Sequence, residues 1–159
     1  MPAAPLIDFD ALDLGKVVAT REDIRRVIMQ RGRMELLDGI AHVDRENALV
    51  VAFVDVRADA WWASDHVPGR PIFPGVLMIE AAAQMCTYDF MHRQPDMQGT
   101  FVGFAGVDRV RFRAAVEPEC RMHFAGRVTR IRSNMFSYTT QSFVGRKLVF
   151  EADILGMVV

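Results

Sequence analysis

Hydrophobic residues recur along this chain with two different periods. Between residues 21 and 30 they recur every three or four positions, which predicts a short helix. Thr20 and Asp23 have the spacing of a capping box at its start. From residue 34 onward the apolar residues form short runs or alternate with polar ones, which favours β-strands. We expect strands over residues 34–43, 48–56, 101–115, 121–131, 135–144 and 147–155.

One long apolar run interrupts these strands. Residues 76–85 are apolar almost throughout, and a helix that is apolar all round belongs in a core. It should end at about residues 91–94, before Pro95. The loop ahead of it is broken by residues that neither a helix nor a sheet tolerates, namely Pro68, Gly69, Pro71, Pro74 and Gly75. Pro74 suits the first turn of the helix, where its missing N–H is not needed.

One long helix among strands that are mostly adjacent in sequence predicts an α+β fold. The apolar face of an antiparallel sheet would be buried on that helix. The strand over 48–56 is apolar almost without interruption, so we expect it to be covered on both faces. A turn at Gly145-Arg146 should join the last two strands as a hairpin. The 159 residues suffice for a single domain, with residues 1–19 as a loosely ordered N-terminal arm.

Composition narrows the classes of function. The chain is 51% hydrophobic and 25% charged with a net charge of −1, which argues against a nucleic-acid binder. Neither a signal peptide nor a membrane span is expected, because the N-terminus lacks a basic apolar leader and the apolar run contains an acid. The two cysteines and the remaining histidines lack metal-ligand spacing, so we expect reduced thiols, no metal site and a cytoplasmic protein.

The charge is distributed unevenly along the chain. Residues 1–99 carry 10 Lys and Arg against 15 Asp and Glu, whereas residues 100–159 carry 9 against 5. Three arginines alternate along one predicted strand and should therefore share a face: Arg109, Arg111 and Arg113. They form either a solvated face or a docking patch for an acidic partner.

The candidate chemistry lies in the loop and the apolar helix. Glu80 and Gln84 are four residues apart and so share one helix face. A carboxyl in apolar surroundings has a raised pKa and can act as an acid, while His66, with an ordinary pKa of about 6.5, can act as a base. The backbone amides of Gly75 and Val76 open the helix and can hold developing negative charge. Each residue also has a non-catalytic interpretation. His66 could be an exposed loop histidine, Glu80 could form a structural ion pair, and Gln84 could serve only in helix packing.

Residues 66–84 resemble the signature of the 3-hydroxyacyl-[acyl-carrier-protein] dehydratases of the FabZ type. The matching positions are the histidine, the loop prolines and glycines, and the helix acid and amide: His66, Pro68, Gly69, Arg70, Pro71, Pro74, Gly75, Val76, Leu77, Glu80, Ala81 and Gln84. Weaker similarity at Leu37-Asp38 and at residues 104–113 extends the resemblance over roughly residues 21–156.

The resemblance implies a hotdog fold, in which an antiparallel sheet wraps around one long helix. It implies a homodimer, with trimers of dimers in some members, that dehydrates 3-hydroxyacyl thioesters reversibly to trans-2-enoyl thioesters without a metal or other cofactor. The thioester would be carried on acyl carrier protein or coenzyme A, in fatty acid or polyketide biosynthesis. His66 of one chain would be the base and Glu80 of the other the acid, with Gly75 as the oxyanion donor. The other expected substrate-binding or positioning residues are Val76, Gln84 and Val67.

The chain departs from the family pattern around the histidine, before the first strand and after the long strand, where Pro118-Glu119-Cys120 replaces Pro-Gly-Asp. Asp65 and Val67 stand where the family usually has Gly and Phe around the histidine, and Gly32 stands where it has an aromatic residue. Val67 and Gly32 remove aromatic bulk near the expected substrate entrance. These changes bear on acyl chain length and carrier docking, and they leave the catalytic pair intact.

Three other functions stay open. One is a dehydratase that also isomerises the double bond, against which Glu80 speaks because isomerising relatives carry Asp there. Another is a hotdog thioesterase, which usually lacks the His-Pro-Gly loop. The last is a non-catalytic subunit that binds acyl thioesters.

Overall fold

The computed structural model describes residues 3–159. Its elements in chain order are β1 (Ala19–Thr20), α1 (Arg21–Arg25), η1 (Gly32–Met34), β2 (Gly39–Asp44), β3 (Leu49–Val56), α2 (Gly75–Arg93), η2 (Pro95–Met97), β4 (Val102–Phe112), β5 (Cys120–Arg132), β6 (Met135–Val144) and β7 (Lys147–Val158). Within residues 3–159 no helix is long and apolar enough to cross a lipid bilayer.

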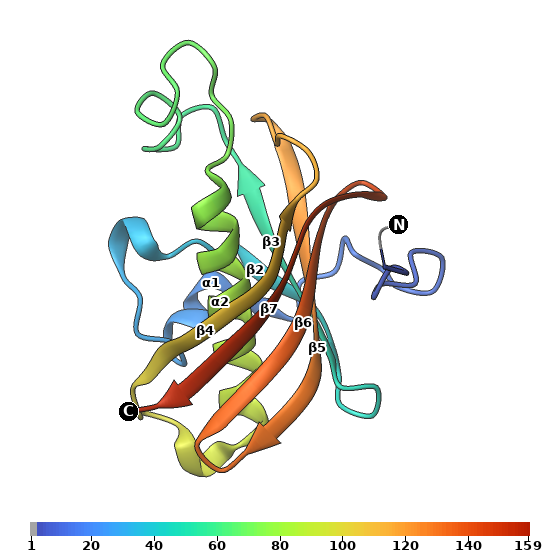
Figure 1. Ribbon diagram of the computed structural model, residues 1–159, viewed down its shortest axis with the longest axis vertical. Helices are drawn as coiled ribbons and strands as arrows, with labels where there is room; N and C mark the ends of the chain where they lie inside the picture. Colours follow the sequence, from blue (N-terminus) through green and yellow to red (C-terminus); the bar gives the residue numbers. More distant parts are fainter. Residues whose placement is uncertain (1–2) are drawn as a thin grey trace.

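The strands form one antiparallel sheet that curls around α2 (Figure 1). Its order is β1-β2-β3-β5-β6-β7-β4, so β4 forms one edge and is paired with β7 alone. The helix buries most of its length, with Ala81, Met85 and Phe90 fully enclosed. The predicted α+β hotdog fold is therefore confirmed, as are the end of α2 and the hairpin between β6 and β7.

The region between α1 and β2 differs from the prediction. The capping box of Thr20 and Asp23 is present, but α1 ends at Arg25 rather than near residue 30. The next strand begins at Gly39 rather than at residue 34, because the backbone before it bonds to a side chain instead of a strand. Gln84 of α2 accepts from the N–H of Leu36 and donates to the carbonyl of Met34. These backbone groups are thus satisfied without a strand partner.

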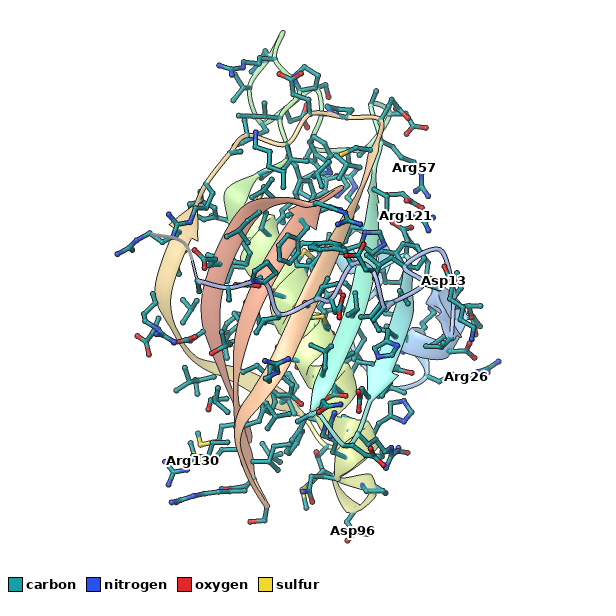
Figure 2. The ribbon with its side chains drawn as sticks, turned by 90° about the vertical axis from the view of Figure 1, so that its right-hand side faces the viewer. Asp13, Arg26, Arg57, Asp96, Arg121 and Arg130 are labelled. Carbon is teal, nitrogen blue, oxygen red and sulfur yellow. The ribbon has the colours of Figure 1, made fainter. Side chains whose placement is uncertain are left out.

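The N-terminal arm covers the outer face of the sheet. We expected a loosely ordered segment, whereas residues 3–18 cross the strands on the face opposite α2 (Figure 2). Ile7 is only 3% exposed and belongs to a second, smaller core with Val51 and Phe143. Gln141 of β6 holds the arm by its backbone, donating to Ala4 and accepting from Leu6. This cover explains why β3 is buried on both faces, as predicted.

Candidate active site

His66 is held by the backbone of its own loop. Residues 57–74 project beyond the sheet near the start of α2 (Figure 1), and the loop is anchored by Trp62 and Phe73, two buried rings that meet edge to face at 5.2 Å. The N–H of His66 donates to the carbonyl of Trp62 at 2.9 Å. Its Nδ1 lies 3.0 Å from the carbonyl oxygen of Ile72. Because a carbonyl only accepts, Nδ1 carries the proton and Nε2 of the neutral ring keeps a free lone pair.

Helix α2 begins beside this loop with unpaired amides. Pro74 is the N-cap residue, one position earlier than the first helical turn, and Gly75 opens the helix. Within residues 3–159 the N–H groups of Gly75 and Val76 have no hydrogen-bond acceptor. They therefore form the positive end of the helix and are free to bind an oxyanion.

The ring of Phe112 lies against Gly75. A Cβ at residue 75 would lie 2.8 Å from Cε1 of Phe112, so a larger residue there would require the ring to shift. The same ring is 53% exposed and lines the pocket in front of the helix. The sequence places Phe112 within an expected strand, over residues 101–115, and no pattern in it indicates the contact of this ring with the start of α2.

His66 and the helix amides share one open pocket of about 460 Å³. Its walls are mainly apolar, and its other lining residues are Ile72, Phe73, Met78, Phe112, Arg113, Ala114 and Ala115. A pocket of this size and character is typical of small-molecule sites. It brings a possible base to the same space as a possible oxyanion donor.

Glu80 and Gln84 line a second, much narrower pocket of about 30 Å³. Gln84 is 1% exposed, and its Nε2 donates to Oε1 of Glu80 at 2.9 Å and to the carbonyl of Met34 at 2.7 Å. Its Oε1 accepts from the N–H of Leu36 at 3.3 Å. Glu80 itself is partly exposed. Gln84 thus fixes one carboxyl oxygen of Glu80 and ties the loop before β2 to the helix.

The two halves of the expected site lie in different pockets of this single chain. No hydrogen bond joins His66 to Glu80 in the part of the chain that the structure describes. Val67, expected near the substrate, is 36% exposed and lines neither pocket. Among residues 3–159 no three His, Cys, Asp or Glu side chains are grouped as a metal site requires.

The arginines at the end of β4 and directly after it are largely paired with carboxylates. Arg109, Arg111 and Arg113 line one shallow pocket together with Glu151 and Asp153. Arg109 pairs with Asp153 at 2.6 Å, and Arg113 pairs with Glu151 at 2.6 Å. The hydrogen bond to Asp153 raises the pKa of the Arg109 guanidinium. Two of the three cations are therefore neutralised within the chain, which favours a solvated face over a docking patch.

Comparisons with known proteins agree with this fold and identify the family. A family model described as a FabA-like domain matches residues 28–153. The 3-hydroxyacyl-[acyl-carrier-protein] dehydratase FabZ of Pelotomaculum thermopropionicum is 32% identical over 132 residues, which are 83% of this chain and 93% of that protein. The protein of the same name from Campylobacter jejuni is 30% identical over 139 residues, covering 86% and 94%.

Solved structures also resemble the chain. The dehydratase heterocomplex ApeI:P from Xenorhabdus doucetiae aligns with a TM-score of 0.73 at 16% sequence identity, covering 86% of this chain and 90% of the other. At that identity the likeness concerns the fold alone. The solved structure shares the antiparallel sheet wrapped around the long helix.

Proposed function

The chain belongs to the FabA-like family, and on that premise we propose that it is a 3-hydroxyacyl-[acyl-carrier-protein] dehydratase. This lyase would reversibly convert a 3-hydroxyacyl thioester into the trans-2-enoyl thioester and water. Relatives of that name that align with more than four-fifths of this chain support the reaction. The observation that supports the roles of the residues is the pocket that His66 lines together with Gly75 and Val76, whose amides are free.

In this proposal His66 removes the proton from C2 of the substrate. Its Nδ1–H bond to the carbonyl of Ile72 leaves Nε2 as the accepting atom. Negative charge then develops on the thioester oxygen. The amides of Gly75 and Val76 hold that charge, because the first N–H groups of a helix point outward at its positive end.

Glu80 acts as the acid in the same step. Its proton goes to the C3 hydroxyl, the C3–O bond breaks, and the electron pair of the C2–H bond becomes the new double bond. Water leaves with the oxygen from C3, and hydration is the reverse. Gln84 donates to Oε1 of Glu80 and leaves Oε2 for the substrate. The atoms and electrons of this reaction balance without an oxidant, a reductant or a metal.

A complete site would combine His66 of one chain with Glu80 of another. The support within one chain is that the two residues line separate pockets and that β4 presents an unpaired edge. Apolar side chains are exposed on or beside this edge: Phe101, Phe104, Val107 and Phe112. An unpaired strand with apolar side chains is a template for pairing with a second copy. The open pocket at His66 is suited to the flexible thiol arm of a carrier protein or coenzyme A.

The test is hydration of a short trans-2-enoyl thioester, followed by loss of the conjugated double bond. Carrier-protein and coenzyme A thioesters are compared. His66→Ala and Glu80→Gln should each lower kcat by roughly 10²–10⁴-fold, whereas His42→Ala, on β2 and outside both pockets, should not. Full activity in either site variant would contradict the assigned roles. Release of free thiol would identify a thioesterase, and acyl binding without turnover would identify a binding subunit.

Co-expression of the two inactive variants tests whether the site is shared. A mixed dimer of His66→Ala and Glu80→Gln chains would contain one site with both native residues. Random pairing should then restore about a quarter of the native activity, because half of the dimers are mixed and each has one intact site. No recovery in isolated mixed dimers would place both residues of a site in the same chain.

A further inference from the structure

The position of Glu80 determines where the acyl chain of the substrate must go. This argument rests on the proposed function. If Glu80 protonates the hydroxyl on C3, then C4 and the carbons beyond it lie next to Glu80, on the side away from His66. The pocket lined by Glu80 continues along α2 past Ala83 and Thr87, one and two turns further on. The substrate tail therefore enters this pocket.

This pocket is short. Its free space is about 30 Å³, and one water-sized group needs roughly 10–15 Å³. That leaves room for about two or three such groups, which are similar in size to methyl or methylene groups. The pocket by His66 is about 460 Å³ and does not share this restriction.

Phe136 lines the pocket and is held in place by its neighbours. The ring is 2% exposed and packs on Phe90 of α2 with ring centres 4.9 Å apart. Tyr138 contacts it edge to face at 5.4 Å. On the neighbouring strand it lies over Gly156, its register partner, where a Cβ would come within 2.6 Å of Cε1 of Phe136. A side chain at residue 156 would overlap the space that the Phe136 ring occupies.

The side of the Glu80 pocket that contains Phe136 is formed within one chain. Gly156 is also the register partner of Phe104 on β4, so Phe136, Gly156 and Phe104 form one row across three strands. Phe104 and Phe136 both line the Glu80 pocket. A second chain along the β4 edge could add walls beside Phe104. It would not remove Phe136, which is buried inside its own chain.

We propose that Phe136, seated on Gly156, is the residue that limits the acyl chain, and that the enzyme acts on short-chain 3-hydroxyacyl thioesters of about four to six carbons. In a hydrophobic pocket, one methylene group without space changes kcat/KM by about 10–200-fold. Longer chains should therefore react much more slowly than the four-carbon substrate. Replacing the ring by a smaller side chain should restore their reaction.

The experiment compares kcat/KM for enoyl thioesters of four, eight and twelve carbons. The native protein should prefer four carbons to eight by at least about tenfold. Phe136→Leu should raise the ratio of the eight-carbon to the four-carbon rate by about tenfold. The matched control is Phe124→Leu, the same change at a fully buried ring of β5 that lines neither pocket, and it should leave the ratio unchanged.

The outcomes separate the inference from the proposed function. Equal turnover of four- and twelve-carbon substrates by the native protein would overturn the inference while supporting the dehydratase reaction. An unchanged ratio in folded Phe136→Leu would also overturn it. No turnover at any chain length would overturn the proposed function, and the inference with it. The dependence of kcat/KM on acyl chain length in the native protein requires no variant. The test therefore remains decisive if Phe136→Leu fails to fold.

Discussion

Replacing Gln84 with methionine should lower both the stability and the turnover of this protein. The amide of Gln84 makes three hydrogen bonds from a position that is 1% exposed. Two reach the backbone of Met34 and Leu36, and the third reaches Oε1 of Glu80. Methionine has a similar size and helix propensity but cannot make any of them. The substitution therefore separates the polar role of the side chain from its volume.

The expected loss of stability in Gln84→Met follows from the hydrogen bonds that are lost. A neutral hydrogen bond contributes about 1 kcal/mol, so the three together contribute about 3 kcal/mol to the free energy of unfolding. In a domain of this size each kcal/mol shifts Tm by about 2–4 °C, which predicts a loss of roughly 6–12 °C. Glu80 would lose the donor that fixes its carboxyl group. A misplacement of about 1 Å can cost about 10²-fold in rate, so kcat should fall by about 10–100-fold with KM little changed.

Gln141 provides the matched control. It is also a 1% exposed amide with a donated and an accepted backbone bond, but it holds the N-terminal arm on the far side of the sheet. Gln141→Met should therefore lower Tm by a few degrees and leave kcat unchanged. Both variants are assayed by thermal unfolding and by enoyl-thioester hydration, at a temperature where each is folded.

The comparison of the two variants decides whether Gln84 positions the acid. If Gln84→Met lost stability but kept native kcat, the amide would serve only to hold the loop before β2. If both variants lost kcat in proportion to their loss of stability, the effect would be global. Only a selective loss of kcat in Gln84→Met agrees with a positioning role.

Two further predictions concern buried groups that line neither pocket. Tyr138→Phe should lower the free energy of unfolding in urea by about 1.5–3 kcal/mol. The Tyr138 hydroxyl donates to the buried Asp89 carboxylate, which also pairs with Arg93. A loss below about 0.5 kcal/mol would contradict this reasoning. Burial lowers the pKa of His123, whose Nε2 lies 3.2 Å from the carbonyl oxygen of Leu14. The unfolded chain then binds the proton more readily, so stability should fall as the pH drops below about 6.5. His123→Gln should flatten the dependence of Tm on pH between about 7.5 and 5.5, and equal slopes would contradict the reasoning.

The elements that the sequence predicts well are those with local causes. The capping box of Thr20 and Asp23, the turn at Gly145 and the apolar run of α2 each depend on neighbours in the chain. The candidate site also rests on a local pattern, because His66 and Glu80 lie within one short segment. Their catalytic roles stay a prediction.

The features that escaped prediction depend on contacts between distant residues. The backbone at residues 34–36 is bonded to Gln84, 48 residues beyond Leu36, so its apolar pattern resembled a strand that does not form. The apolar residues of the arm are buried by strands that follow much later in the chain. Phe112 of β4 contacts Gly75 of α2, and no pattern within either segment indicates that contact.

Strand β4 links the two pockets that the proposed reaction requires. Phe112 at its end lines the pocket of His66, and Phe104 near its start lines the pocket of Glu80. Both rings are about half exposed, at 53% and 50%, on the only long strand at an edge of the sheet in residues 3–159. A chain that paired with this edge would contact the walls of both pockets at once. Assembly along β4 would therefore set the shape of the substrate space, while Phe136, buried within each chain, would still set its depth.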